Sequence, residues 1–376
     1  MKKINKLTHI SIFLLLFSCL FISCGTEEEP TEEALIVTVN TSNVTVGNSV
    51  TFTASSTISG DLTSVATFFV NDEQIEGNSF TPAIANESNE VYATYNGMTS
   101  GTVTFSSTDV IPSKYTQKVL VEDYTGTWCI YCPRMALILD FFTDYSDKVV
   151  PIAIHCEGEG LDDPWIYEHW EQMADVNNYN APAQPRGKIN RIFDVNMYQN
   201  TEFCPTNPDT FNAQLDSYLN QTAPLGLAVN SSLDGNSLSI NVKVGFATDN
   251  ISNPKLVVNL IEEELVHDQR NAYAGSTIPN CVFNQGQYNV DPILNFPQKH
   301  VLMKSYTDIF GDNIPEDEVS EGNVWSQNFN VSLPSHVTNS QNLYIVAFVV
   351  GNGDKINSRP ALNVQRAKVG FNQSFD

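Results

Sequence analysis

The amino-acid sequence predicts a multi-domain protein with an N-terminal β-sandwich, a central α/β domain and a C-terminal domain similar to a β-sandwich. Three observations lead to this prediction. The chain has 376 residues, which is more than one hydrophobic core normally supports. Segments rich in Thr, Ser and Val alternate apolar and polar residues in both terminal regions, as strands do. Between residues 113 and 221, strand-like and helix-like segments alternate instead, which is typical of a partly parallel sheet.

The first 23 residues have the features of a signal peptide. A basic start with three lysines precedes an apolar run over residues 10–23, which is short for a membrane span. Small residues flank Cys24 as in a bacterial lipobox, although Phe21 stands where leucine is commonest. We therefore expect Cys24 to be lipidated and to hold the protein at a membrane of the cell envelope. Simple cleavage that leaves a free Cys24 is the alternative.

The segment 24–33 is acidic, contains a proline and is expected to form a tether. It resembles a surface-export signal of some Gram-negative bacteria, but a solvated spacer fits equally well, so both the periplasmic and the cell-surface side stay open. Removing residues 1–23 takes away three lysines and no acid, which leaves 16 basic and 43 acidic residues and a net charge of −27. This charge argues against a nucleic-acid partner, whose phosphates need Lys and Arg.

The N-terminal β-sandwich is expected over residues 34–108. Period-2 alternation, with Gly, Asn and Asp between the runs, indicates a small antiparallel sandwich. The stretch VTVGNSVTFT at residues 44–53 resembles bacterial immunoglobulin-like modules. That resemblance implies an immunoglobulin-like β-sandwich that spaces, presents or binds. Residues 106–113 are the expected linker to the next domain.

The central domain is expected over residues 113–221. The predicted strands are 118–124, 148–155 and 187–191, and the predicted helices are 133–145, 164–176 and 207–221. Pro133 fits the first helical turn, where a missing N–H is tolerated. The segment 119–134 is the most informative part of this domain, because it places a Cys-x-x-Cys pair between a strand and a helix.

Cys129 and Cys132 form this pair. A helix N-terminus offers unpaired N–H groups and the positive end of the helix dipole, which lower the pKa of a thiol. We therefore expect Cys129 to be the exposed nucleophile of thiol–disulfide exchange and Cys132 to be the resolving thiol. Glu122 and Asp123 should point to opposite faces of their strand, so only one of them can serve as the base for Cys132.

The strand, the Cys-x-x-Cys pair and the helix resemble the thioredoxin superfamily over residues 113–221. Trp128 directly precedes Cys129, and Asp123 stands where that family carries a buried proton-shuttling acid. The resemblance implies that Pro185 is a cis-proline beside the disulfide, with Pro182 as the other candidate. Two features depart from the family pattern: the intervening dipeptide is Ile-Tyr, and Pro133 follows the second cysteine. For Asp123, an ordinary exposed acid at the end of the strand is the alternative.

Other functions of the cysteines remain open at this point. A closed structural disulfide is the main alternative for the Cys-x-x-Cys pair in an oxidising envelope. Zinc is disfavoured because no second Cys-x-x-Cys or paired histidines accompany it. Cys156, Cys204 and Cys281 leave one cysteine unpaired, and the sequence does not fix their connectivity. No glycine-rich nucleotide loop and no serine–histidine–acid cluster occurs, so no cofactor or metal is expected.

From residue 222 to residue 376 the pattern returns to strands, interrupted by a long irregular connection at about 270–320. The stretches QGQYN at 285–289, NFPQKHV at 295–301 and VQRAKV at 364–369 resemble the family related to outer membrane protein 28. The resemblance covers about residues 113–376. It implies an envelope or outer-membrane lipoprotein of a Gram-negative bacterium.

Two functional hypotheses follow. In the first, a lipid-anchored envelope protein exchanges disulfides with envelope proteins through Cys129 and Cys132. In the second, the protein is a surface binding or adhesion lipoprotein, and its thioredoxin-like unit is a scaffold for β domains that hold a ligand. A fold hosts many functions, so only the site can decide between them.

Overall fold

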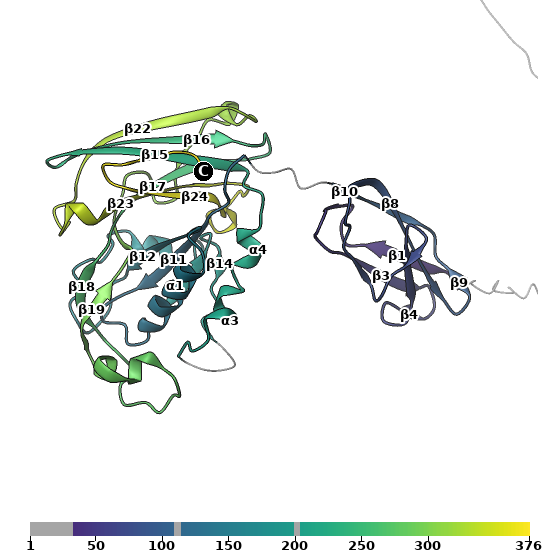
Figure 1. Cartoon of the computed structure of the whole chain (residues 1–376), viewed down its shortest axis with the longest axis horizontal. Helices are drawn as coiled ribbons and strands as arrows, with labels where there is room; N and C mark the ends of the chain where they lie inside the picture. Colours follow the sequence, from purple (N-terminus) through teal and green to yellow (C-terminus); the bar gives the residue numbers. More distant parts are fainter. Residues whose placement is uncertain (1–32, 109–113, 199–203) are drawn as a thin grey trace, which may run out of the picture. The chain divides into compact units, whose positions relative to one another are not determined.

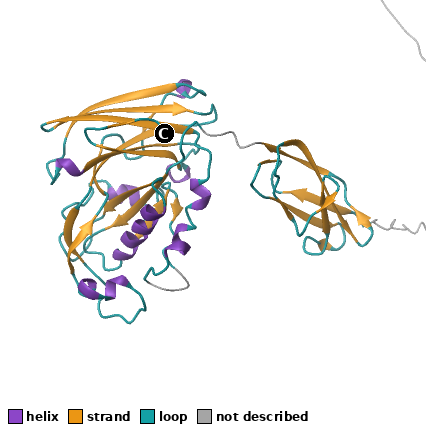
Figure 2. Cartoon of the chain, in the orientation of Figure 1, coloured by secondary structure: helices purple, strands orange, loops and turns teal. Residues whose placement is uncertain are grey.

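The computed structural model describes residues 33–108, 114–198 and 204–376 and divides into two compact units, 1–110 and 111–376. The predicted signal peptide, the lipidation site Cys24 and all but the last residue of the predicted tether lie outside the described residues. Strands predominate in both units (Figure 2), so the protein is multi-domain and β-rich, as predicted. None of the described helices has the length and apolar character needed to cross a membrane.

The N-terminal unit contains two sheets around one hydrophobic core (Figure 1). One sheet has the order β1-β3-β4 with β7 paired to β3, and the other has the order β2-β10-β8-β5-β6 with β9 paired to β8. Alternate residues of β3, such as Val50 and Phe52, are buried because every second side chain of a strand faces the same side. The strands are β1 (Leu35–Val39), β2 (Asn43–Thr45), β3 (Val50–Ser56), β4 (Gly60–Asp61), β5 (Thr67–Val70), β6 (Glu73–Gln74), β7 (Ser79–Phe80), β8 (Asn86–Tyr95), β9 (Met98–Thr99) and β10 (Val103–Thr108).

The second unit is built on a nine-stranded sheet with the order β14-β13-β11-β12-β20-β17-β23-β24, to which β21 is added beside β17. Strand β11 is parallel to β12 and antiparallel to β13, and β12 is parallel to β20. The strands are β11 (Val119–Thr125), β12 (Val149–His155), β13 (Arg186–Ile189), β14 (Phe193–Asp194), β17 (Lys255–Glu262), β20 (Val301–Ser305), β21 (Asp312–Asn313), β23 (Leu343–Val350) and β24 (Ala361–Lys368).

The expected boundary between residues 221 and 222 does not separate compact units. Strands from both sides of it join the same nine-stranded sheet, and residues 111–376 form one unit. The junction is β20, which pairs with β12 on one side and with β17 on the other. Strand β20 lies inside the stretch that was expected to be irregular. Its five residues are too few to show a clear alternation of apolar and polar side chains, so the sequence does not reveal the strand.

Helix α1 (Pro133–Tyr145) covers one face of this sheet. Its buried residues Met135, Ile138, Leu139 and Phe142 follow the helical spacing and pack on side chains that include Val121. Full burial of each such side chain stabilises the fold by roughly 1.5–3 kcal/mol. Helix α1 has the bounds that the sequence predicts.

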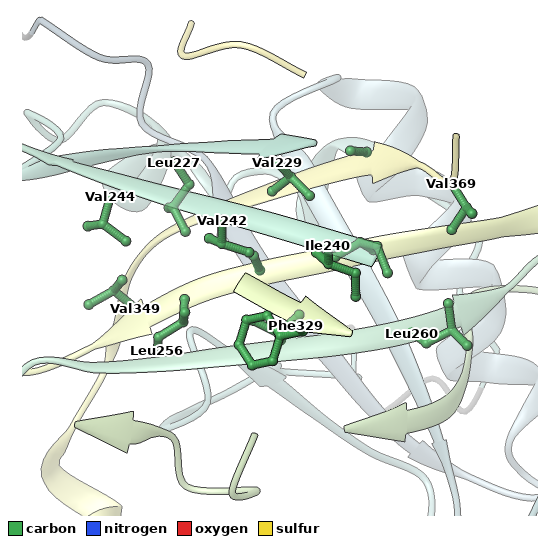
Figure 3. Packing of buried hydrophobic residues seen from close by; sticks show 14 of the residues in the cluster. Leu227, Val229, Ile240, Val242, Val244, Leu256, Leu260, Phe329, Val349 and Val369 are labelled. Carbon is green, nitrogen blue, oxygen red and sulfur yellow. The ribbon is translucent and has the colours of Figure 1, made fainter. Parts of the chain in front are cut away.

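A second sheet, β22-β16-β15-β25, packs against the nine-stranded sheet and forms the largest apolar core (Figure 3). In that core Val242 and Ile240 of one sheet meet Leu256 and Leu260 of the other. The strands are β15 (Leu225–Asp234), β16 (Ser237–Phe246), β22 (Val324–Ser332) and β25 (Asn372–Gln373). Separately, β18 (Leu265–Gln269) and β19 (Ile293–Gln298) form a two-stranded antiparallel sheet.

Two predicted helices are shorter than expected. Only α2 (Trp170–Ala174) forms within 164–176, because the Tyr167 N–H donates to the His155 carbonyl and ties the preceding chain to the end of β12. The stretch 207–221 divides into α3 (Pro208–Asn212) and α4 (Asp216–Leu219). Single-turn 3-10 helices η1 to η5 occupy the remaining connections and span Val282–Asn284, Gly286–Tyr288, Glu316–Glu318, Ser340–Asn342 and Ile356–Ser358.

Candidate redox site

Cys129 and Cys132 form a disulfide in the connection between β11 and α1. The Cys129 N–H donates to the Gly126 carbonyl, and the Cys132 N–H donates to the Cys129 carbonyl, so the loop is a series of tight turns. Helix α1 begins at Pro133, and Cys132 is its N-cap residue. The favourable helix terminus therefore lies at Cys132.

The expectation that Cys129 is an exposed thiol at the start of the helix is wrong for this structure. Cys129 lies one turn before the helix and is only 3% exposed. Residues from the C-terminal half of the chain form hydrogen bonds with the loop on both sides of Cys129. We call residues 265–298, which comprise β18, β19 and their connection, the cap.

The cap is hydrogen-bonded along the Cys129–Cys132 loop. The backbone N–H groups of Arg270 and Ala272 donate to the carbonyls of Thr127 and Ile130, each at 2.8 Å. The side-chain amide of Gln269 donates to the Cys129 carbonyl at 2.9 Å. Sequence reasoning missed this contact because residues 270–292 have no periodicity and form no long element.

An aromatic side chain anchors the cap to the start of α1. Tyr273 is 1% exposed, and its hydroxyl accepts a hydrogen bond of 2.9 Å from Arg134 Nε, which is also buried. The ring of Tyr273 meets that of Tyr131 edge to face at 6.1 Å. Burial raises the pKa of the Tyr273 hydroxyl, so it is a neutral hydrogen-bonding group.

A second disulfide holds the cap in place. Cys204 pairs with Cys281, which resolves the connectivity that the sequence leaves open, and Cys156 is a buried free thiol. The Cys204–Cys281 bridge lies in an apolar cluster with Tyr273 and Phe283. It therefore ties the middle of the cap to the segment that precedes α3.

Asp123 lies behind the disulfide, inside the molecule. It is 2% exposed, and its Oδ1 has no hydrogen-bond partner among the described residues. Burial raises the pKa of this carboxyl well above its usual range. The alternative of an exposed strand-end acid is therefore wrong.

Asp123 and Cys132 line the same cavity, which has a volume of about 240 Å³ and which we call the Asp123 cavity. Most of its wall is apolar and comes from α1 and the cap. The lining includes Asp123, Thr125, Cys132, Pro133, Ala136, Leu137, Phe283, Tyr288, Phe296 and Gln298. Neither Trp128 nor Pro185 is among the lining residues.

Trp128 supports the loop outside the Asp123 cavity and packs against the apolar cluster that contains Cys156. Its indole Nε1–H donates to the Cys156 carbonyl at 2.8 Å. A Cβ atom at Gly158 would lie 2.1 Å from the indole ring, and one at Gly126 would lie 2.4 Å from it. Both positions therefore need glycine, and Gly158 is a site residue that sequence reasoning did not identify.

A buried pair of hydrogen-bonded side chains also braces the loop. His155 Nδ1 and Asp163 Oδ2 are 2.8 Å apart, and Asp163 accepts a hydrogen bond of 2.9 Å from the Thr127 N–H. Burial alone would raise the pKa of Asp163, but the hydrogen bond from His155 and its charge lower the pKa overall. Sequence reasoning did not identify this pair, because only the folded chain brings the two side chains together.

Pro185 follows a cis peptide bond from Gln184. It directly precedes β13, in which Arg186 is opposite Tyr124 of β11. Pro185 therefore lies near the end of β11 from which the chain continues into the Cys129–Cys132 loop. The structure thus brings Asp123 and Cys132 to one cavity, while Trp128 supports the loop and Pro185 is placed at its edge.

Comparisons with solved structures show a likeness of fold only. HBP35 of Porphyromonas gingivalis is 14% identical, with a TM-score of 0.50 over 68% of this chain and 76% of that chain. A DUF4785 family protein of Legionella pneumophila is 9% identical over 89% of this chain and 56% of that chain, and its TM-score of 0.18 supports no conclusion. The curated proteins include no match.

The family comparison is more informative. The model of the family described as outer membrane protein Omp28 matches residues 172–373, which is more than half of the chain. The match supports an association with the outer membrane. It begins after the Cys129–Cys132 loop, so it gives no information about the chemistry of that loop. This chain belongs to the outer membrane protein Omp28 family.

Proposed function

We propose that this protein is a lipid-anchored envelope protein whose Cys129–Cys132 pair exchanges disulfides with envelope proteins in a thioredoxin-like arrangement. One observation carries the proposal: in the cavity that Cys132 also lines, Asp123 is buried and its Oδ1 has no hydrogen-bond partner in the described part of the chain. A buried polar atom without a partner costs about 1–3 kcal/mol, and a purely structural disulfide does not need one. Such groups concentrate at functional sites.

The chemistry assigned to these residues is a two-step exchange. A thiolate of the partner protein attacks the Cys129 sulfur, the Cys129–Cys132 bond breaks, and the Cys132 thiolate takes the proton of the Asp123 carboxyl. The second thiol of the partner then attacks the mixed disulfide and releases Cys129 as a thiolate, which takes up a proton from solvent. The partner is oxidised to a disulfide and the Cys129–Cys132 pair is reduced to two thiols.

In the reverse direction, Asp123 acts as the base. Its carboxylate removes the proton from the Cys132 thiol, whose sulfur attacks the mixed disulfide and releases the partner's thiol. The raised pKa of Asp123 suits both directions, because a carboxyl with a raised pKa can give a proton to the departing Cys132 thiolate and can take one back from the Cys132 thiol. Exchange with a protein requires the cap to move, since it covers Cys129.

The remaining parts of the proposal concern location and organisation. Membership of the Omp28 family supports the outer membrane, and the proposed anchor is a lipid on Cys24 after removal of residues 1–23. Residues 24–33 are the proposed tether. Within the β-rich units, the proposed immunoglobulin-like module spans 34–108, and the proposed thioredoxin-like part and β-sandwich-like part span 113–221 and 222–376.

A second candidate function rests on a different surface. The sheet β22-β16-β15-β25 presents asparagine and serine side chains on one face, and Asn241 donates to Asn328 across neighbouring strands at 2.8 Å. A shallow hollow on this face is lined by amides and hydroxyls without a charged group. Such a face suits a hydroxyl-rich ligand, so it favours the binding or adhesion hypothesis.

The test is a redox titration of the purified protein in thiol buffers, combined with turnover on a disulfide-bonded protein. We expect a midpoint between about −120 and −270 mV, the range of known exchange proteins. Turnover should be lost in Cys129→Ser and kept in Asp144→Asn, an acid-to-amide control on the exposed side of α1. A pair that stays oxidised in strong thiol reductants, without turnover, leaves only the binding function.

A further inference from the structure

Any protein that reaches Cys129 must occupy the space now filled by residues 269–273 of the cap. Those residues satisfy the carbonyls of Thr127 and Ile130 with two backbone N–H groups from alternate residues. The Tyr273 hydroxyl also accepts a hydrogen bond from the buried Arg134 side chain. A partner that failed to replace these contacts would leave polar groups of the loop without hydrogen bonds.

We propose that residues 269–273 are a built-in occupant of the substrate position, which an extended segment of the partner protein replaces. The partner segment carries backbone N–H donors at alternate residues and an aromatic hydroxyl that accepts from Arg134. Binding of this kind extends backbone hydrogen bonding and uses one pocket for specificity. The inference rests on the proposed function, because it names the substrate class of that site.

The occupant is held in its place by its own support. The Asn271 side-chain amide donates to the carbonyls of Phe283, Tyr288 and Val290, so residue 271 is fixed to the rest of the cap. Arg270 forms a two-point ion pair with Asp291. Cys281 then joins this structure to Cys204. Only the last of these connections is covalent, so the Cys204–Cys281 bridge limits how far the occupant can leave.

The experiment measures how fast dithiothreitol reduces the Cys129–Cys132 disulfide in the full chain. Alkylation at time points and mass spectrometry assign each reduced cysteine to its disulfide. We compare the wild type with the double variant Cys204→Ser/Cys281→Ser, which releases the cap without leaving a lone thiol. Reduction in the variant should be about tenfold faster or more, because the covalent bridge no longer limits how far the cap can open.

The second arm adds a synthetic peptide with the sequence of residues 268–274 to the double variant. The peptide should slow reduction towards the wild-type rate, and a peptide with alanine in place of the tyrosine should not. If folding of the double variant is lost by circular dichroism, Tyr273→Phe provides the test with both disulfides intact. That substitution removes the hydroxyl that accepts from Arg134 Nε and should speed reduction about threefold or more.

Each outcome decides one question. Equal reduction rates in folded wild type and variants overturn the inference, as does a peptide without effect on a rapidly reduced variant. Dithiothreitol reports access and needs no catalysis. Faster reduction without turnover on a disulfide-bonded protein would therefore contradict only the proposed exchange function. Turnover with unchanged reduction rates would contradict only the proposal that residues 269–273 occupy the substrate position.

Discussion

On one face of strand β11, Glu122 lies 3.2 Å from Arg191, and both side chains are buried. On the opposite face, Asp123 lines the same cavity as Cys132, and no residue that the structure describes is a hydrogen-bond partner of its Oδ1. Burial raises the pKa of both carboxyls, but for Glu122 the Arg191 guanidinium opposes the rise. The two neighbouring acids thus differ in their surroundings: Glu122 has a charged partner in Arg191, whereas Asp123 has none, and we propose that Asp123 is kept available for proton transfer.

The largest effect on stability is expected on the face of β11 where Glu122 is paired with Arg191. Glu122→Gln should lower the free energy of unfolding by about 3–5 kcal/mol, because it leaves the Arg191 guanidinium buried without its charge partner. Urea denaturation measures the change, and Glu171→Gln on the exposed side of α2 is the control. A loss below about 1 kcal/mol would mean that Tyr179 and the Ile309 carbonyl, which also accept from Arg191, suffice.

The opposite sign is expected on the other face. Asp123→Leu replaces an unpartnered buried carboxyl by an apolar group of similar size, so it should raise the free energy of unfolding at pH 7 by about 1–3 kcal/mol. Urea denaturation with the disulfides intact checks this. A destabilised variant would show that Asp123 contributes to the fold and would remove the contrast with Glu122.

The pH dependence sharpens the same contrast. The folded-state pKa of Asp123 is raised, so the folded protein holds a proton that the unfolded chain releases above about pH 4. Its contribution to stability is therefore fully present below the unfolded pKa and is lost as pH rises towards the folded pKa. Relative to Asp123→Leu, the wild type should lose stability between pH 4 and 7, and parallel stability curves would contradict this.

The smallest effect concerns the free thiol. Cys156 is buried on the Glu122 side of the sheet, and burial raises the pKa of its thiol. We expect no alkylation of Cys156 by maleimide in the native protein at pH 7 within an hour, whereas reduced Cys129 should react once the cap opens. Mass spectrometry of the labelled protein distinguishes the two sites. Rapid labelling of Cys156 would show that this face is open as well.

Local patterns predict the elements of the site better than they predict its surroundings. Helix α1 and strands β11 and β12 follow from apolar periodicity and from Pro133. Strand alternation only places Glu122 and Asp123 on opposite faces, and the choice of Asp123 rests on the thioredoxin resemblance. The cap does not, because its conformation depends on Asn271 reaching three carbonyls and on a bridge between residues 77 apart. The burial of Cys129 depends on the cap, so the sequence pattern did not predict it either.

The shared sheet shows the same limit. Strand β20 has five residues, and its place between β12 and β17 depends on pairings with strands far away in the sequence. Gly158 is required by the indole of Trp128, which approaches it only in the folded chain. Periodicity records the face that a segment buries, but it does not record the segment against which that face packs.

The rate at which Cys132 resolves a mixed disulfide on Cys129 tests the central claim most directly. The measurement follows release of a chromogenic thiol from Cys129 in single-turnover experiments between pH 5 and 9, after the cap has been freed. We predict that Asp123→Asn slows release by about 10²–10⁴-fold at pH 7, while Asp144→Asn does not. Equal rates and equal pH profiles in wild type and Asp123→Asn would contradict a catalytic role for the buried acid.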